Sequence, residues 1–333
     1  MNPLALAKTT RQIVAAVVGV VAVQASFAQT YPSKTVALMV PYPAGGVSDL
    51  IARKVNVALG KSLKQTVIIE NLGGASGAIA AQKVLSAPSD GYYLFQGSPN
   101  ELILAPLANA AVKYKAEDFR QVQTIAIASL AVMARKDLPA NTADELSAYA
   151  IKMAKEGKPL TYASVGQGSF YHLLGEQMSK TIAAPMTHVP YKGGADVLRD
   201  LLGGQVDIFI TPYGTPHVEM AKQGKIKILT ALSPKRQSRL PDVPSVDESQ
   251  SLKGFNYEIG TGYFVKKDTP EAIVQALHKA LTEVLADEEV KAGLTAIGAD
   301  PSTPLSLDAA SKEYAKDTDK FRAIAKSINL QPL

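Results

Sequence analysis

The sequence predicts a two-lobed α/β protein in which each lobe contains a mostly parallel sheet flanked by helices. Three observations carry this prediction. The chain has 333 residues, which is more than one compact core usually holds. Strand-like and helix-like patterns alternate along it, as is typical of a parallel sheet covered by helices. The alternation starts again after residue 130, so a second unit of the same kind is expected.

The N-terminal segment has the pattern of a secretory signal peptide. Lys8 and Arg11 form a basic region, an apolar run covers residues 13–23, and Ser26-Phe27-Ala28 offers the small residues that a signal peptidase reads. A membrane anchor needs about 20 apolar residues, so this run is too short for one. We expect cleavage near Ala28, which removes residues 1–28 and gives a periplasmic product. A mitochondrial presequence or a tethered N-terminus is the alternative.

The first alternation of strands and helices follows directly. Its first helix is marked by Ile51, Val55 and Leu59 at helical spacing, and Ser48 or Asp49 can cap the first turn. The strands are expected at residues 35–40, 66–70 and 92–96, with a second helix at residues 77–86.

The second alternation opens with a strand at residues 130–134 and a helix at residues 142–155. Thr142 and Glu145 form a capping box at the start of this helix. Further strands are expected at residues 160–164, 186–189, 206–211 and 225–232, and further helices at residues 170–180 and 195–202.

The C-terminal segment holds one strand pattern, residues 257–265, and helical patterns at residues 270–285 and 305–328. One strand is too little for an independent sheet, so we expect this segment to return to the first lobe. The chain then crosses between lobes near Leu130 and near Tyr257, which is the architecture of hinge-closing binding proteins. The expected boundaries are residues 29–130 plus 257–333 for lobe 1, and residues 131–256 for lobe 2.

Loops at the carboxyl ends of the predicted strands have the composition of an anion site. Ligands of parallel α/β sheets bind at these ends, where loops lead into helix N-termini. A glycine-rich turn, a hydroxyl residue and a helix follow one another at residues 41–49 and again at residues 164–169. Each turn exposes unpaired N–H groups and the positive end of a helix dipole, so the two are suited to hold a dicarboxylate from both ends. The alternative is that the glycines serve tight turns and serine only caps the helix.

The expected ligand-binding residues come from these loops and from two further strand ends. The first lobe supplies Tyr42, Pro43, Ala44, Gly45, Gly46, Val47, Ser48 and Asp49, with Ser98 and Asn100 after the third strand. The second lobe supplies Ser164, Gly166, Gln167, Gly168, Ser169 and His172, with Thr211 and Tyr213 at the end of another strand. For Thr211 and Tyr213 an ordinary turn with a packed tyrosine is the alternative.

No catalytic, metal or cofactor site is expected. The chain has no cysteine and no Gly-x-Ser-x-Gly nucleophile elbow. Gly60-Lys61-Ser62 resembles the end of a phosphate loop, but Val55 stands where that motif requires glycine. The four histidines lack metal-ligand spacing. The formal charge of +5 is scattered without a basic run, so we expect a small ligand and no nucleic acid, bound by a monomer.

A series of motifs then follows in order along almost the whole mature chain. They are Tyr31-Pro32-Ser33-Lys34, Val40-Pro41-Tyr42-Pro43-Ala44-Gly45-Gly46 with Asp49, Ile69-Glu70-Asn71, Asp90-Gly91-Tyr92, Tyr162-Ala163-Ser164, Gly168-Ser169 with His172-Leu173, Val189-Pro190-Tyr191-Lys192-Gly193, Leu201-Leu202-Gly203-Gly204-Gln205-Val206-Asp207 and Leu240-Pro241-Asp242-Val243-Pro244-Ser245. In this combination the chain resembles the substrate-binding proteins of tripartite tricarboxylate transporters, the Bug family. The resemblance implies a type II-like periplasmic binding protein with two hinge crossovers that hands a carboxylate to separate membrane permease subunits. It also implies that residues 41–49 and 164–169 hold the carboxylate, partly through ordered waters.

Three departures from the family pattern bear on the ligand. Leu72 stands where the family usually has an arginine, and Thr211 where many members have Asp or Asn. A family tryptophan is absent near Thr261 and Tyr263. Thr211 offers only a hydroxyl, so a plain acid is expected rather than an amino acid, and the ligand's identity does not transfer. A ligand-sensing partner of a signalling system, or an enzyme acting on a carboxylate, is the alternative function.

Overall fold

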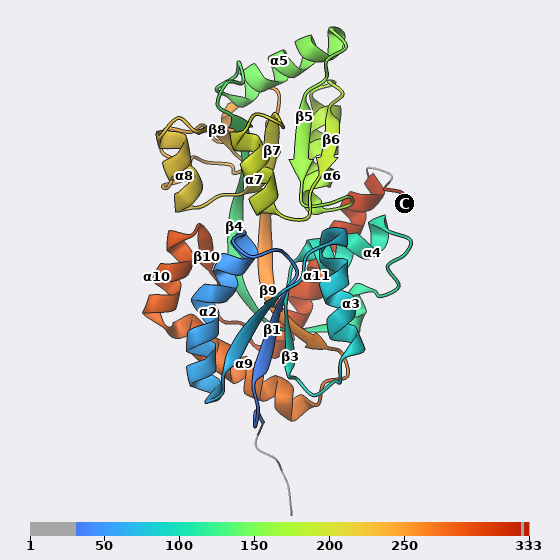
Figure 1. Cartoon of the computed structure of the whole chain (residues 1–333), viewed down its shortest axis with the longest axis vertical. Coiled ribbons are helices and arrows are strands. Elements are labelled where there is room, and N and C mark those ends of the chain that lie inside the picture. The colour runs from blue at the N-terminus through green and yellow to red at the C-terminus, as the bar shows by residue number, and fades with distance from the viewer. Residues whose placement is uncertain (1–30, 328–329, 333) are drawn as a thin grey trace, which may run out of the picture. The chain divides into compact units, whose positions relative to one another are not determined.

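The computed structural model describes residues 31–327 and 330–332, so the expected signal peptide, residues 1–28, lies outside the described residues. The chain divides into a short unit, residues 1–33, and a large unit, residues 34–333, which holds the helices and strands given below. The large unit has the two-lobed α/β fold that the sequence predicts (Figure 1). No helix in the described part of the chain is long and apolar enough to cross a membrane.

Lobe 1 is built on a sheet whose first three strands are parallel. β1 (Val36–Val40) pairs with β2 (Val67–Asn71) on one side and with β3 (Tyr93–Gly97) on the other. All five residues of β1 are buried, as expected for a strand covered on both faces. α2 (Val47–Leu63) and α3 (Ala78–Ser86) lie on opposite sides of β1 in Figure 1.

Two antiparallel strands, β4 (Phe119–Arg135) and β9 (Glu258–Lys266), occupy the middle of the strand order β2-β1-β3-β9-β4-β7-β5-β6. β9 pairs with β3 and with the first part of β4. From Leu130 onward the partners of β4 are β7 (Ile208–Pro212) and β8 (Ile226–Ala231). The strand predicted at residues 130–134 is therefore only the end of a 17-residue strand. The first part of β4 was not predicted as a strand, because the buried polar residues Gln121, Gln123 and Thr124 interrupt the apolar pattern.

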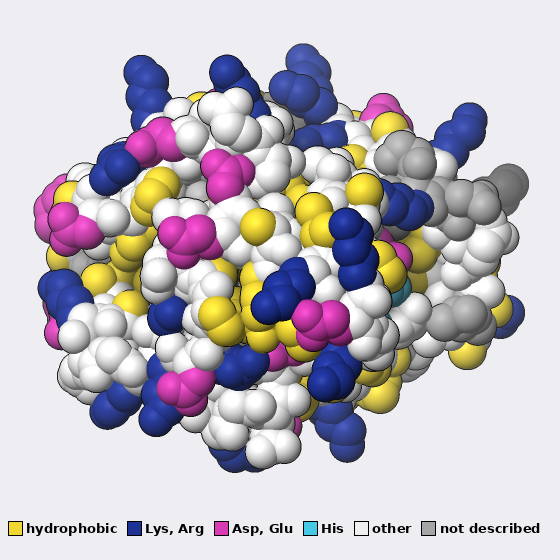
Figure 2. Space-filling view, turned by 90° about the horizontal axis from the view of Figure 1, so that it is seen from above, with side chains coloured by type: hydrophobic (Ala, Val, Ile, Leu, Met, Phe, Trp, Pro, Cys, Tyr) yellow, Lys and Arg dark blue, Asp and Glu magenta, His cyan; other side chains and the backbone are white. Residues whose placement is uncertain are grey.

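Lobe 2 combines β7 and β8 with two further parallel strands. β5 (Thr161–Ser164) pairs in parallel with β6 (Thr187–Pro190) and with β7. The helices of this lobe are α5 (Ala143–Lys155), α6 (Phe170–Thr181), α7 (Gly194–Leu202) and α8 (Thr215–Lys222). The predicted Thr142 cap of α5 is confirmed, since its side chain accepts from the Glu145 N–H. The capping box is not complete, because the Glu145 carboxylate accepts from the Asn141 N–H and not from that of Thr142. Viewed from above in Figure 2, Lys and Arg side chains are interspersed with Asp and Glu.

Apart from the 3₁₀ turn η4 (Val246–Glu248), the remaining elements surround the sheet of lobe 1. They are the 3₁₀ turns η1 (Ala75–Gly77) and η3 (Ala116–Asp118), the π-helix η2 (Asn100–Leu104), the helices α4 (Ala105–Ala108), α9 (Glu271–Ala286), α10 (Glu288–Ala296) and α11 (Leu307–Ser327), and the short strand β10 (Ala299–Pro301). α2 packs against α9 and α10, whereas α11 packs against β4 and η2. The sequence patterns do not predict η2, α4, α8, α10 or β10. η2, α4 and β10 have three to five residues, which is too short for the spacing signal of a helix or strand. α8 buries no residue and α10 buries only Val290 and Leu294, so neither shows a clear apolar stripe.

The two lobes touch through backbone groups and small side chains. The Ser76 hydroxyl donates to the carbonyl of Gln167 over 2.7 Å, and the Phe170 N–H donates to Asn100 Oδ1 over 2.6 Å. A Cβ atom added to Gly168 would lie 1.9 Å from the Cβ of Ala108. The loop at residues 164–169 thus lies directly on lobe 1.

Candidate functional site

A cavity of about 60 Å³ lies between the lobes, at the N-termini of α2 and α7. Its lining contains no charged residue among those the structure describes. It is lined by Tyr42, Gly46, Val47, Ser48, Ile51, Ser98, Asn100, Ala128, Val165, Tyr171, Gly194, Thr211, Pro212, Ile259 and Thr261. Seven of these residues were predicted from the sequence: Tyr42, Gly46, Val47, Ser48, Ser98, Asn100 and Thr211.

The N-terminus of α2 opens onto this cavity without a side-chain cap. Gly46 is the N-cap residue, its backbone is extended (φ −79°, ψ 169°), and no side chain bonds to the first turn. Gly45, before it, has φ +85°, a conformation that favours glycine. The first N–H groups of a 17-residue helix and its positive dipole end are therefore directed to the cavity lined by Gly46, Val47 and Ser48.

Asp49 holds the loop that precedes this helix. Its Oδ2 accepts from the Gly45 N–H over 2.9 Å and from Arg53 Nε over 2.8 Å, and the side chain is 2% exposed. Burial by itself raises the pKa of Asp49, but the hydrogen bonds from Arg53 and Gly45 outweigh it and the net shift is downward. Asp49 is thus ionised at neutral pH and fixes Gly45, while it does not itself line the cavity.

The N-terminus of α7 is the second uncapped helix end at the cavity. Gly193 is its N-cap residue with extended backbone, no side chain caps the helix, and Gly194 lines the cavity. This helix start was not predicted as part of the site, because Gly193 lacks the Ser, Thr, Asp or Asn side chain that marks a helix cap in a sequence. The signal that would have found it is Gly193-Gly194 directly after a strand and before a helix, which is the same arrangement as Gly45-Gly46.

The predicted loop at residues 164–169 lies beside the cavity, and its polar groups form hydrogen bonds with other groups of the protein. Ser169 caps α6 by accepting from the His172 N–H, and the Gly168 N–H donates to His172 Nδ1 over 3.0 Å. The Phe170 N–H is taken by Asn100. From this region only Val165 and Tyr171 line the cavity. The other predicted residues of this region lie beside the cavity and do not line it: Ser164, Gly166, Gln167, Gly168, Ser169 and His172.

The other predicted residues lie at its edge. Pro43 packs near Gly73 and Gly193, where a Cβ would lie 2.8 Å and 2.7 Å from its ring. Ala44 and Gly45 are exposed at the tip of the loop. Tyr213 is buried behind Thr211 and does not line the cavity.

Two stacked histidines support the loop at residues 164–169. The rings of His172 and His188 lie 4.0 Å apart, and His188 Nε2 is 2.7 Å from the Ser164 hydroxyl. Burial lowers the pKa of His172, and burial together with the neighbouring His172 lowers that of His188 to about 3. Both rings are therefore neutral at pH 7 and bring no positive charge to the cavity.

Glu101 lies behind the wall formed by Tyr42 and Ser98 and was not predicted from the sequence. Its side chain is 1% exposed, and its Oε2 accepts from the Tyr42 hydroxyl and the Ser98 hydroxyl, each over 3.0 Å. Its Oε1 accepts from the Ser98 N–H. Burial raises the pKa of Glu101 to about 7, although these hydrogen bonds lower it in part. The stretch Pro99 to Leu104 gives no sequence signal for a buried acid, because glutamate before an apolar run is usual in a surface helix.

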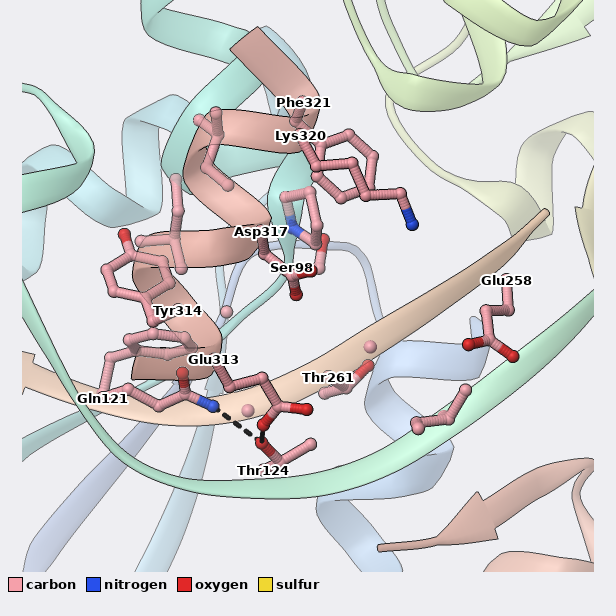
Figure 3. A pocket seen from close by; sticks show the side chains of 18 residues that line it. Ser98, Gln121, Thr124, Glu258, Thr261, Glu313, Tyr314, Asp317, Lys320 and Phe321 are labelled. Carbon is pink, nitrogen blue, oxygen red and sulfur yellow. Dashed lines mark hydrogen bonds between the residues drawn. The ribbon is translucent and has the colours of Figure 1, made fainter. Parts of the chain in front are cut away.

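A second cavity, about 110 Å³, lies under α11 and is acidic (Figure 3). Figure 3 shows Glu313, Asp317 and Lys320 projecting from α11 above Thr124 and Thr261 of the strands. Burial raises the pKa of Asp317; Lys320 opposes this, and the charges of Glu313 and Glu258 add to it. A cavity whose own carboxylate is disfavoured in its charged form by burial and by neighbouring carboxylates also disfavours a bound anion. The smaller cavity, which no charged residue of the described chain lines, has no such obstacle to an anion.

Comparisons with known proteins concern the whole chain and show its family. The family model described as the tripartite tricarboxylate transporter family receptor matches residues 51–330. BugT of Bordetella pertussis is 30% identical over 285 residues, which cover 82% of this chain and 83% of that protein. MatC of Rhodopseudomonas palustris, solved with bound malate, is 28% identical with a TM-score of 0.81, covering 88% of this chain and 99% of that one. An R. palustris protein solved with adipate is 29% identical with a TM-score of 0.83, covering 91% and 100%.

Proposed function

Since the chain belongs to the tripartite tricarboxylate transporter receptor family, whose members are periplasmic solute-binding proteins, we propose that it captures a small dicarboxylate between α2 and α7. One carboxylate accepts from the first N–H groups of α2, and the other from those of α7. Lobe 1, residues 29–130 plus 257–333, then carries one half of the site, and lobe 2, residues 131–256, carries the other.

The observation that carries this proposal is the pair of uncapped helix N-termini at one uncharged cavity. Each helix end leaves N–H groups without intrahelical partners and contributes a favourable dipole of about 0.3–1 kcal/mol toward an anion, and up to about 2 kcal/mol when partly buried. Neither Gly46 nor Gly193 places a side chain on its helix end, whereas Thr142 and Ser169 cap α5 and α6. α3, α4, α8 and α9 also begin without a side-chain cap, but their first residues do not line the cavity, whereas those of α2 and α7 do.

The composition of the cavity favours a plain acid. Among the described residues no Asp or Glu lines it, so an ammonium group would find no ionic partner there. Tyr171, Thr211 and Thr261 add hydroxyl groups that can orient the middle of a ligand, and Ile51 and Ile259 contact its apolar atoms. Malate and adipate, seen in two related proteins, are short dicarboxylates of this kind.

We also propose that the chain performs no chemistry on the ligand. The pair closest to a catalytic arrangement is Ser164 and His188, with 2.7 Å between Oγ and Nε2. Ser164 is 0% exposed and its hydroxyl also donates to the Gly166 carbonyl, so no substrate carbonyl can reach it. In this proposal residues 1–28 direct export and are removed, and the loaded receptor delivers the acid to the membrane permease subunits of a tripartite transporter.

A thermal-shift screen of the mature protein tests the proposal. A ligand that binds only the folded state raises the melting temperature, by an amount that grows with its concentration relative to Kd. Short dicarboxylates are expected to raise it, and diamines of the same chain length are not. The control is Gly260→Val, since a Cβ there meets nothing within 4 Å and Gly260 lines only the second cavity. If no carboxylate raises the melting temperature, or if Gly260→Val abolishes the shift, the site is wrong.

A further inference from the structure

Glu101 is an acid buried directly behind an anion site, and no cation balances it. It is 1% exposed, and in the described part of the chain no Lys, Arg or His forms an ion pair with it. Its partners are instead Tyr42 and Ser98, which both line the ligand cavity. The charge of Glu101 therefore bears directly on what the cavity offers to a ligand.

An ionised Glu101 fixes the direction of two hydroxyl hydrogens. A carboxylate can only accept hydrogen bonds, so the hydroxyls of Tyr42 and Ser98, each 3.0 Å from Oε2, both donate to it. Neither hydroxyl hydrogen is then available to a ligand carboxylate, which requires donors, and the Ser98 oxygen also accepts from the Asn100 N–H over 3.3 Å. The second negative charge also repels the ligand in an environment that screens it less than water does.

A protonated Glu101 reverses both effects. Its own O–H donates to one of the two hydroxyls, and the hydrogen of that hydroxyl becomes free to point into the cavity. The repulsion disappears with the charge. We propose that the receptor takes up one proton on Glu101 when it binds a carboxylate, so that acid and proton are captured together. This inference rests on the proposed function; the proton comes from solvent, and no covalent bond to the ligand forms or breaks.

The surroundings of Glu101 agree with such a role. The titratable groups that face it are tyrosines on four different segments: Tyr42 after β1, Tyr114 before η3, Tyr171 in α6 and Tyr314 in α11. Burial raises the pKa of each tyrosine, so each stays neutral at neutral pH. Burial also raises the pKa of Glu101 to about 7, so protonation at neutral pH costs little free energy.

Isothermal titration calorimetry of the mature protein tests the coupling. The probe is whichever of malate, adipate, citrate and benzoate raises the melting temperature most. If binding requires protonated Glu101, linkage predicts that the Kd at about pH 8.5 is about 25-fold weaker than at about pH 6.5. Heats measured at about pH 8 in two buffers with different ionisation enthalpies should show close to one proton taken up per bound ligand.

Glu101→Gln separates this role from a merely structural one. The amide donates to the same hydroxyls as the protonated acid, so this variant should bind at high pH as tightly as the wild type does at low pH, without proton uptake. Glu313→Gln is the matched control, because Glu313 accepts from a threonine hydroxyl at the second cavity, and its proton uptake should equal that of the wild type. Wild-type binding without proton uptake, or equal uptake by Glu101→Gln, overturns the inference and leaves carboxylate capture intact. Absence of binding by all four acids at both pH values overturns the proposed function and the inference with it.

Discussion

Replacing Gly46 with valine should block the end of α2 without unfolding the protein. The backbone of Gly46 is extended, a conformation that valine adopts readily, and a Cβ there meets only the Pro43 carbonyl, at 3.6 Å. Valine is a poorer N-cap than glycine, so we expect α2 to lose about 1 kcal/mol of stability or less. The two methyl groups of valine then occupy space at the cavity wall.

The expected loss of affinity follows from the contacts that these methyl groups prevent. A backbone N–H donating to a carboxylate contributes about 1.5–3 kcal/mol, because the acceptor is charged. Loss of one such contact at α2 should therefore cost about 1.5–3 kcal/mol, which weakens Kd roughly 10- to 150-fold. Gly46→Ala adds one methyl group only and should fall between the wild type and Gly46→Val.

Calorimetric titration with the acid identified by thermal shift is the assay, with circular dichroism and melting temperature as checks of folding. Gly260→Val adds the same side chain at the second cavity and should bind within about threefold of the wild type, since it removes no contact to the ligand. A folded Gly46→Val protein with wild-type affinity would refute the role of the α2 N-terminus.

Three further predictions concern neighbouring groups. Gly194→Val should weaken ligand binding to a similar degree, because it blocks the start of α7 in lobe 2, and the protein should still fold, since a Cβ there meets only the Phe209 ring at 4.0 Å. If this variant binds with wild-type affinity, α7 is not part of the site. Asp49→Asn should lower the free energy of unfolding by about 1–2 kcal/mol and weaken binding, because the buried Oδ1 position has no acceptor for an amide N–H. Since the pKa of Asp49 is lowered in the folded state, urea titrations should show the same loss of stability at every pH above about 5. Tighter ligand binding by this variant would contradict the role of Asp49 in holding the loop. For Glu101 the folded pKa of about 7 exceeds the ordinary value of 4.5, so the folded state holds the extra proton and wild-type stability should fall by up to about 3 kcal/mol as pH rises from 4.5 to 7. Glu101→Gln should lack this fall, and parallel stability curves for the two proteins would show that burial does not shift this acid.

The α/β class and most elements of the fold are readable from sequence, because their signals are periodic. The fully apolar run Val36 to Val40 predicts a covered strand, and Thr142 with Glu145 predicts the start of α5. The loop around Gly46 is also selected correctly as a lining segment of the cavity. Its role in binding stays a prediction.

The parts that escape the sequence depend on contacts between distant segments. Whether Ser169 faces a ligand or its own helix is decided by His172 and Asn100, which take the nearby N–H groups. Gly194 is selected only once it is known that no side chain caps α7. Glu101 faces tyrosines that are distant in the sequence, among them Tyr42 and, 213 positions after Glu101, Tyr314. No local sequence pattern predicts that Glu101 is buried.

The continuous strand β4 has a consequence for how this chain can vary in length. Its residues pair with β9 up to Ser129, with irregularities at Gln121–Gln123 and Thr124–Ala126, and pair with β7 without interruption from Leu130 to Ala134. Inserting or deleting one residue here would move every following side chain to the opposite face of the sheet, so that the buried Val132 and the residues beside it would exchange faces with their neighbours. In a surface loop, a one-residue insertion or deletion costs little free energy. In β4, the same change would shift the pairing of the strands that follow in lobe 2. Natural length variation should therefore gather in exposed loops such as residues 156–159 and avoid residues 126–134, and a fusion or tag inserted at the former should be tolerated.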